Sequence, residues 1–139
     1  MLIGEYRHSL DSKGRVNFPA KLREDLGDSF IICKGLDNCL YVYRMSEWDK
    51  LVERTAALPT SKARTIQRFF FASAVCAEPD KQGRVLIPQT LRDYAGLTNE
   101  IAVIGVSTRA EIWDSARWEE ANAALTSESV AETMEELGF

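Results

Sequence analysis

Histidine, cysteine and long apolar runs are scarce in this chain of 139 residues. The spacing between Cys33 and Cys39 is not that of a metal-binding knuckle, and His8, the single histidine, offers little help as a ligand. We therefore expect neither a metal nor a cofactor. The odd set of thiols, which also includes Cys76, is predicted to stay reduced and to pack as small apolar side chains.

No segment approaches the roughly 20 consecutive apolar residues that a membrane-spanning helix needs. Residues 1–6 also lack the basic region, apolar run and small-residue cleavage site of a signal peptide. These absences favour a cytoplasmic protein that has no membrane partner.

Sequence patterns of catalysis are missing as well. The chain has no Gly-x-Ser-x-Gly elbow, no phosphate-binding glycine loop and no cluster of metal ligands. Carboxylates could act alone, but nothing distinguishes any pair of them. We interpret the chain as a binding protein and not as an enzyme.

The net charge of −4 is unusual for a nucleic-acid binder, so the distribution of the charge matters. Residues 1–23 have a local balance of +3, whereas residues 111–139 have a balance of −7. Such asymmetry between the ends of a chain is more informative than its total. One end can face a polyanion while the other end stays away from it.

An internal repeat is the strongest feature that is present. Residues 11–23 (DSKGRVNFPAKLR) align without a gap with residues 80–92 (DKQGRVLIPQTLR). This alignment predicts a duplication. The identical pairs are Asp11/Asp80, Gly14/Gly83, Arg15/Arg84, Val16/Val85, Pro19/Pro88, Leu22/Leu91 and Arg23/Arg92.

Both copies predict the same succession of elements around an Asp-x-x-Gly-Arg turn. Glycine tolerates the positive φ of such a turn, aspartate can accept backbone hydrogen bonds, and the following proline suits the first turn of a helix. The predicted strands span residues 6–10, 15–18, 30–34, 40–43, 75–78, 84–87, 100–105 and 111–114. The predicted helices span residues 20–26, 46–57, 61–72, 89–95 and 116 onward.

No low-complexity linker separates the copies, and strands this short bury little surface alone. We therefore expect the two copies to share one core. The aromatic residues Trp48, Trp113 and Trp118 are core candidates. The run Phe69–Phe71 covers more than one face of a helix, so it is expected in the core or at a subunit interface.

The segments GEYRHSLDSKGRV (residues 4–16), PAKLR (19–23) and DKQGRV (80–85) resemble the MraZ family, whose halves are AbrB-like domains. The resemblance covers essentially the whole chain. It implies an α+β fold, a tandem-duplicated swapped-hairpin β-barrel with pseudo-two-fold symmetry and flanking helices. The division that we expect is an AbrB-like half at 1–58, a connecting helix at 59–73, and a second half with the C-terminal helix at 74–139.

The same resemblance implies a function. Members of the family are bacterial transcriptional regulators that form ring-shaped homo-oligomers and associate with the nucleoid. They bind double-stranded DNA at tandem short repeats upstream of the division and cell-wall gene cluster, which includes their own gene. For this chain the resemblance implies such a regulator, with repression as the natural default.

The chemistry of the turn fits contact with DNA. The planar fork of Arg15 can bond to guanine O6 and N7 at once in the major groove, while Lys13 and Arg7 supply charge to phosphates. His8 is a further candidate for phosphate contact. A carboxylate would be repelled by phosphates, so Asp11 is expected to hold the turn together with Gly14.

The second turn is expected to be the weaker reader. The acidic residue Glu78 lies nearby in the sequence, so we expect Arg84 to contact DNA only secondarily or to have a structural role. Asp80 and Gly83 are expected to shape the turn itself. The helical residues Arg23 and Arg92 are expected to be solvated or paired with neighbours such as Glu24 and Asp93.

Three other interpretations stay open. The Asp/Arg pairs can be local ion pairs that only stabilise turns, as in a purely structural ring protein. An antitoxin-like AbrB relative would bind DNA through a similar barrel and capture a toxin with its tail. A carboxylate-only enzyme is the third, and nothing in the sequence favours it.

Overall fold

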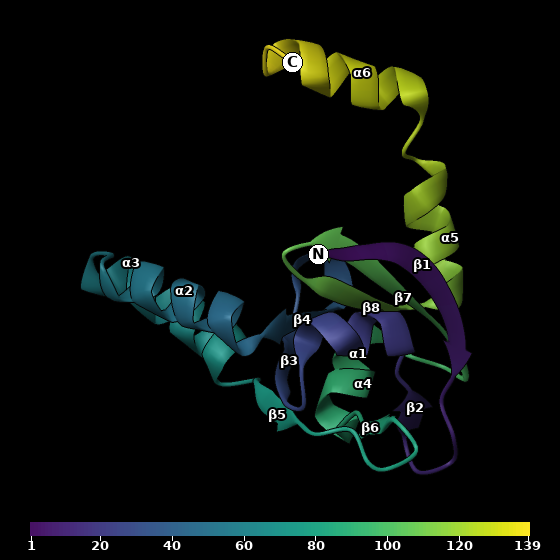
Figure 1. The fold of residues 1–139 in the computed structure, drawn as a ribbon. Helices are drawn as coiled ribbons and strands as arrows, with labels where there is room; N and C mark the ends of the chain where they lie inside the picture. Colours follow the sequence, from purple (N-terminus) through teal and green to yellow (C-terminus); the bar gives the residue numbers. More distant parts are fainter.

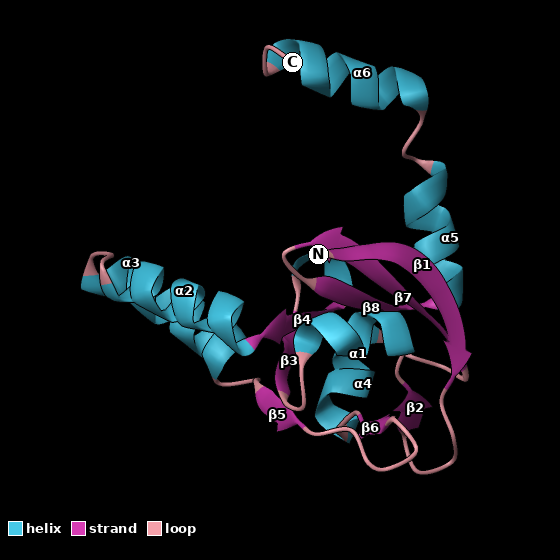
Figure 2. Cartoon of the chain, in the orientation of Figure 1, coloured by secondary structure: helices cyan, strands magenta, loops and turns pink.

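The computed structural model describes residues 1–139 and contains six α-helices together with eight strands in two antiparallel sheets, which confirms the predicted α+β class (Figures 1 and 2). The strands are β1 (Leu2–Ser9), β2 (Arg15–Asn17), β3 (Phe30–Lys34), β4 (Leu40–Arg44), β5 (Val75–Ala77), β6 (Arg84–Leu86), β7 (Glu100–Ser107) and β8 (Ala110–Asp114). The helices are α1 (Ala20–Leu26), α2 (Met45–Ala56), α3 (Thr60–Ile66), α4 (Gln89–Ala95), α5 (Ser115–Ala123) and α6 (Ser127–Glu136). A short 3₁₀-helix, η1 (Leu36–Asn38), and a π-helix, η2 (Gln67–Phe71), complete the chain.

The larger sheet interleaves the two halves of the chain. Its strand order is β1-β7-β8-β4-β3-β5, so β1 of the first half pairs with β7 of the second half. Conversely, β5 of the second half pairs with β3 of the first, and β4 pairs with β8 at the centre. Exchanging each strand for its repeat counterpart gives the same order read backwards.

The smaller sheet joins the two repeats directly. Strands β2 and β6 are antiparallel, and Val16 lies opposite its own repeat counterpart Val85. On either side of this pair, Arg15 lies opposite Leu86 and Asn17 opposite Arg84. The register is therefore the same when it is read from either half.

The larger of two buried clusters contains residues of both halves, so the halves share a core as the sequence predicted. Side chains that are at most 2% exposed come from α1, β2 and β3 of the first half and from β6, α4 and β7 of the second. Examples are Val16, Leu22, Val85, Leu91 and Ile101. Because short strands bury little surface alone, this mixing lets two small units form one stable interior.

The three adjacent phenylalanines pack within the chain. Phe70 stacks on Tyr41 at a ring-centroid distance of 6.2 Å, and Phe71 meets Trp48 edge-on at 5.2 Å. Phe69 lies 6.0 Å from Tyr94. These contacts anchor η2 and α3 to the sheet, while α2 and α3 run beside one another as an arm that projects from the body (Figure 1).

Three predicted elements differ most from the structure. Strand β1 begins at Leu2 instead of residue 6, because β7 pairs with it along its whole length. The C-terminal helix is two helices, since Thr126 and Ser129 form a capping box that starts α6. The helix expected over 61–72 changes to π geometry at Gln67, where the phenylalanines turn toward their aromatic partners.

The two Asp-x-x-Gly-Arg loops lie together at one end of the body, beside β2 and β6, and α6 lies at the opposite end (Figures 1 and 2). Strand β2 contacts β6 directly, which fixes this neighbourhood. None of the helices combines the length and the apolar character that crossing a membrane requires.

Candidate nucleic-acid interface

Asp11 lies at the centre of the first loop. Its Oδ1 accepts hydrogen bonds from the backbone N–H groups of Lys13 and Arg15, each at 2.9 Å. Its Oδ2 accepts a hydrogen bond from Nε of Arg15 at 2.8 Å. Gly14 adopts a φ of 80°, a left-handed conformation that favours glycine. One carboxylate thus closes the turn and also fixes the base of the arginine side chain.

The Asp11–Arg15 ion pair leaves the two terminal nitrogens of the guanidinium without a partner. Only Nε of Arg15 is bound to Asp11, and neither terminal nitrogen has a partner within the chain. Those two nitrogens form the part of the guanidinium that can bond two acceptors on one guanine edge. A local ion pair and base contact are therefore compatible, and the ion pair orients the side chain.

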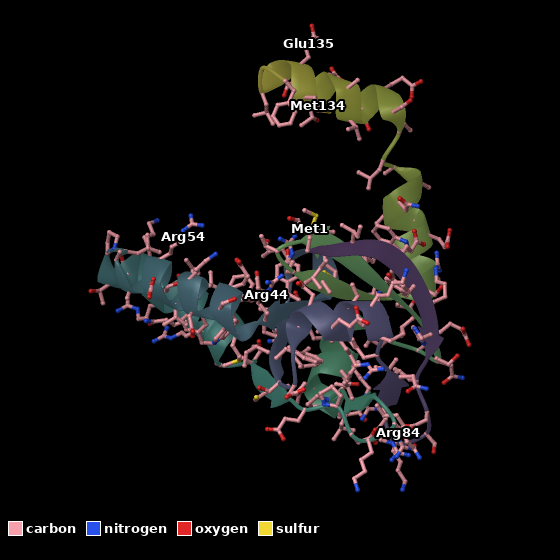
Figure 3. All side chains as sticks on the ribbon, in the orientation of Figure 1. Met1, Arg44, Arg54, Arg84, Met134 and Glu135 are labelled. Atoms are coloured by element: carbon pink, nitrogen blue, oxygen red, sulfur yellow. The ribbon has the colours of Figure 1, made fainter.

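The second loop repeats this geometry. Asp80 accepts hydrogen bonds from the backbone N–H groups of Gln82 and Arg84 at 2.9 Å and from Nε of Arg84 at 2.8 Å. The side chains of Arg15 and Arg84 are 30% and 32% exposed, so neither is more accessible than the other. The difference expected between the loops therefore has no counterpart in their internal geometry. Figure 3 shows Arg84 at the end of the molecule, far from α6.

Both aspartates are held in their charged form. The backbone N–H of Arg15 is the main cause that lowers the pKa of Asp11 below its usual value, and the guanidinium of the same residue adds to it. The backbone N–H of Arg84 does the same for the pKa of Asp80. At neutral pH each loop therefore contains an intact Asp–Arg pair.

Exposed lysines accompany both arginines. Lys13 lies in the first loop and Lys81 in the second, and neither forms an ion pair. Sequence reasoning overlooked Lys81, although the alignment that found the repeat places it opposite Ser12 in the same turn. Glu78, which we expected to weaken the second loop, makes no ion pair with Arg84, whose carboxylate partner is Asp80.

Arg7 differs from its expected setting. Its guanidinium donates to Ser115 Oγ at 2.6 Å and to Glu5 Oε1 at 2.7 Å, and it also contacts Glu119. These carboxylates neutralise its charge on the face of β1 that α5 covers, which removes it from the unpaired cations of the loop end. His8 is half-buried, and burial lowers its pKa below the usual 6.5, so its imidazole is neutral at pH 7.

The prediction that Arg23 and Arg92 are solvated or paired with acidic neighbours was wrong. Nε of Arg23 donates to the carbonyl oxygen of Phe18 at 3.0 Å, and Nε of Arg92 donates to that of Ile87 at 2.8 Å. Neither residue has a carboxylate partner, and both are half-buried beside the loops. Each of these hydrogen bonds spans only five residues, whereas the position of each guanidinium beside the loop of the other half depends on pairing across the repeat, which no local pattern reveals.

The expectation that the thiols pack as small apolar side chains holds for two of the three cysteines. Cys33 and Cys39 are buried, whereas Cys76 is exposed, and all three are free. Burial raises the pKa of Cys33 to about 12, and it also raises the pKa of Cys39. No three side chains of the His, Cys, Asp and Glu types converge in the chain.

The profile of the family described as "MraZ protein, putative antitoxin-like" matches the chain twice, over residues 1–69 and 70–137. The chain belongs to the MraZ family. The two MraZ matches meet inside the segment 59–73 that we expected to connect the halves, and the division at 1–58 and 74–139 stays a prediction.

Relatives in the MraZ family align along their whole length. A protein of Caldicellulosiruptor bescii is 57% identical, one of Clostridium tetani is 55% identical, and one of Acetivibrio thermocellus is 53% identical. In each comparison all of this chain and all of the relative are covered. Each of these relatives is named "Transcriptional regulator MraZ".

Proposed function

We propose that the protein is a DNA-binding transcriptional regulator, a repressor that reads double-stranded DNA with its Arg-bearing loops. The names of its relatives support a regulator of transcription. The observation that carries the DNA contact is the geometry of the loops. Arg15 and Arg84 each keep both terminal nitrogens free, and the two loops lie at the same end of the molecule (Figure 1). Such a fork suits guanine, the commonest specific contact of arginine in the major groove.

The reading residues in this proposal are Arg15 as the main base contact, Lys13 for phosphates, and Arg84 as a secondary contact. Lys81 joins them, because it is an exposed, unpaired lysine on the same end. His8 enters only as a neutral hydrogen-bond donor, and Arg7 is left out because two carboxylates already bind it. The turn residues Asp11, Gly14, Asp80 and Gly83 shape the loops.

The swapped-hairpin barrel belongs to this proposal as well. The order of the larger sheet, which is the same from either half, supports it, as does the Val16–Val85 pair of the smaller sheet. In such an arrangement one pseudo-two-fold axis relates the two loops, which explains why both lie at the same end of the molecule.

We further propose a ring-shaped homo-oligomer. Helix α6 buries no residue, and its apolar side chains Val130 and Met134 are 43% and 41% exposed, as is Leu137 directly after the helix at 69%. Its charged residues are all acidic, whereas those of α3 on the projecting arm, Lys62 and Arg64, are both basic. A contact between α6 of one copy and α3 of the next joins two different surfaces, and such head-to-tail contacts generate a ring when the rotation between copies closes.

In this proposal the ring binds tandem short repeats upstream of the division and cell-wall gene cluster, which includes the protein's own gene. Several identical loops on one face raise the effective concentration for each successive repeat. A single loop makes a small footprint and binds weakly, so assembly supplies the affinity. An antitoxin-like DNA binder is the alternative that the family description favours.

A titration of labelled DNA from upstream of the protein's own gene tests the proposal. The wild type is expected to bind specifically and to lose affinity as salt rises, because bound phosphates release counterions. Arg15→Ala should lower the affinity by roughly 5- to 150-fold, the range of one bidentate base contact. Equal binding by this variant would remove the main site assignment, and absence of binding by the wild type would favour a structural ring.

A further inference from the structure

Two arginines outside the Asp-x-x-Gly-Arg motif extend across the boundary between the halves. Arg92 belongs to α4 of the second half, yet its guanidinium covers Gly14 in the loop of the first half. A Cβ atom added to Gly14 would lie 2.6 Å from Cζ of Arg92. Arg23 of α1 does the same for the second loop, where a Cβ atom added to Gly83 would lie 2.8 Å from Cζ of Arg23.

Backbone hydrogen bonds complete each of these contacts. The N–H of Ile87 donates to the carbonyl oxygen of Gly14 at 2.9 Å, and the carbonyl oxygen of Ile87 accepts from Nε of Arg92 at 2.8 Å. The equivalent contacts form at the second loop. There the N–H of Phe18 donates to the carbonyl oxygen of Gly83 at 3.0 Å, and Nε of Arg23 donates to the carbonyl oxygen of Phe18. Each loop is thus attached to the opposite half at its glycine.

We propose that Arg92 positions the Arg15 loop and that Arg23 positions the Arg84 loop, so that each half of the chain holds the DNA-reading loop of the other half. Gly14 and Gly83 serve two purposes in this arrangement: they allow the positive φ of the turn, and they leave space for the guanidinium. The role in DNA reading rests on the proposed function, whereas the crossed support of the loops does not.

The absence of ion pairs supports a positioning role. An arginine that only solubilises a helix would be exposed, and one that only stabilises it would pair with a carboxylate on the same helix. Arg23 and Arg92 are half-buried, have no carboxylate partner, and donate to carbonyl groups that follow β2 and β6. A planar guanidinium can donate from Nε and still lie flat over a glycine, which a lysine cannot do.

Amide hydrogen exchange of the full-length protein tests the crossed support. Arg92→Met is expected to speed exchange at the N–H groups of Lys13 and Arg15 by about tenfold, the effect of losing one hydrogen bond in a local opening. Exchange at Gln82 and Arg84 should stay at the wild-type rate. The matched variant Arg23→Met should give the reverse pattern.

Two outcomes would overturn the proposal. One is equal acceleration in both loops, which indicates general destabilisation, and the other is acceleration only in the loop of the substituted half. Should Arg92→Met fail to fold, Arg92→Lys is the second variant, and the same crossed pattern is required of it because lysine lacks the planar Nε donor.

DNA affinity then links the support to function. Arg92→Met should weaken binding to tandem-repeat DNA more than Arg23→Met does, because Arg92 holds the loop of the main reader. If Arg92→Lys restored wild-type affinity, Arg92 would act as a phosphate cation and not as a positioning residue. If the wild type bound no DNA, the proposed function would fail, while the exchange pattern would still decide the crossed support.

Discussion

Arg15 shows how one side chain can belong to a turn and still remain available for recognition. Asp11 binds Nε, which orients the guanidinium, and the two terminal nitrogens stay free. The sequence predicted the motif and the aspartate in the turn, because both depend on residues within one loop. It did not predict Arg92 over Gly14, because that contact depends on how the halves pair.

Arg15→Lys is expected to separate recognition from charge. Lysine keeps the positive charge but loses the fork, so affinity for the specific repeat should fall roughly 5- to 150-fold while the salt dependence stays unchanged. Fluorescence anisotropy at several salt concentrations measures both quantities. Arg84→Lys is the matched control at the equivalent position, and a larger loss from it than from Arg15→Lys would reverse the assignment of the main reader.

The contribution of Asp11 to the stability of the first turn is expected to change only at acidic pH. Its pKa in the folded protein lies below the usual 3.8, because the N–H of Arg15 and then its guanidinium stabilise the carboxylate. A lowered pKa means that the contribution to stability is present above the unfolded value and disappears as pH falls through the folded value. A carboxyl ¹³C titration by NMR should give Asp11 a midpoint below 3.8. A midpoint at or above this value would contradict the hydrogen bonding described here.

At the scale of elements, local signals gave accurate boundaries. The predicted helices 20–26 and 89–95 coincide with α1 and α4, because a proline precedes each helix and a glycine follows it. Long-range pairing caused the error at the start of β1, whereas the break between α5 and α6 follows from a local capping box. Residues 2–5 form a strand only because β7 lies beside them, and nothing in their own sequence indicates that partner.

Interleaving makes each half depend on the other for strand partners. Residues 1–73 contain β1 and β2, whose partners β7 and β6 lie in the second half. Expressed alone, this segment should fold only as a dimer, in which a second copy supplies the missing strands. Analytical ultracentrifugation and circular dichroism over a range of concentrations would measure both mass and folding, and a folded monomer would refute the expectation.

Leu86, the last residue of β6, and Ile87, which follows it, form a matched pair for measuring the free energy of unfolding. Ile87 is fully buried and bonds to the Gly14 loop, whereas the adjacent Leu86 is 56% exposed. Ile87→Ala should lower the free energy of unfolding by about 2–5 kcal/mol, because it leaves a cavity in the shared core. Leu86→Ala should change it by less than about 0.5 kcal/mol. Urea denaturation measures both, and similar values for the two variants would contradict a core that spans both halves.

At the scale of the molecule, the two Asp-x-x-Gly-Arg loops and the acidic helix α6 lie at opposite ends (Figures 1 and 3). The separation matches the charge asymmetry of the sequence. A chain that ends at Ala124 lacks α6, and native mass spectrometry should find it in smaller assemblies than the full chain. Its affinity for a single repeat should be unchanged, because the loops are intact; an unchanged assembly would instead assign the ring contact to other surfaces.

Several loops on one face of a ring require the DNA repeats to present the same groove to each of them. Repeats spaced by about 10 base pairs, one helical turn, satisfy this requirement. Inserting about half a turn between two repeats moves the second one to the opposite side of the duplex, so the affinity gained from the second loop should be lost. Inserting a full turn serves as the control and should retain much more of it, because the groove face is restored. The titration compares the three spacings at one salt concentration, and equal affinity for all three would refute multivalent binding by the ring.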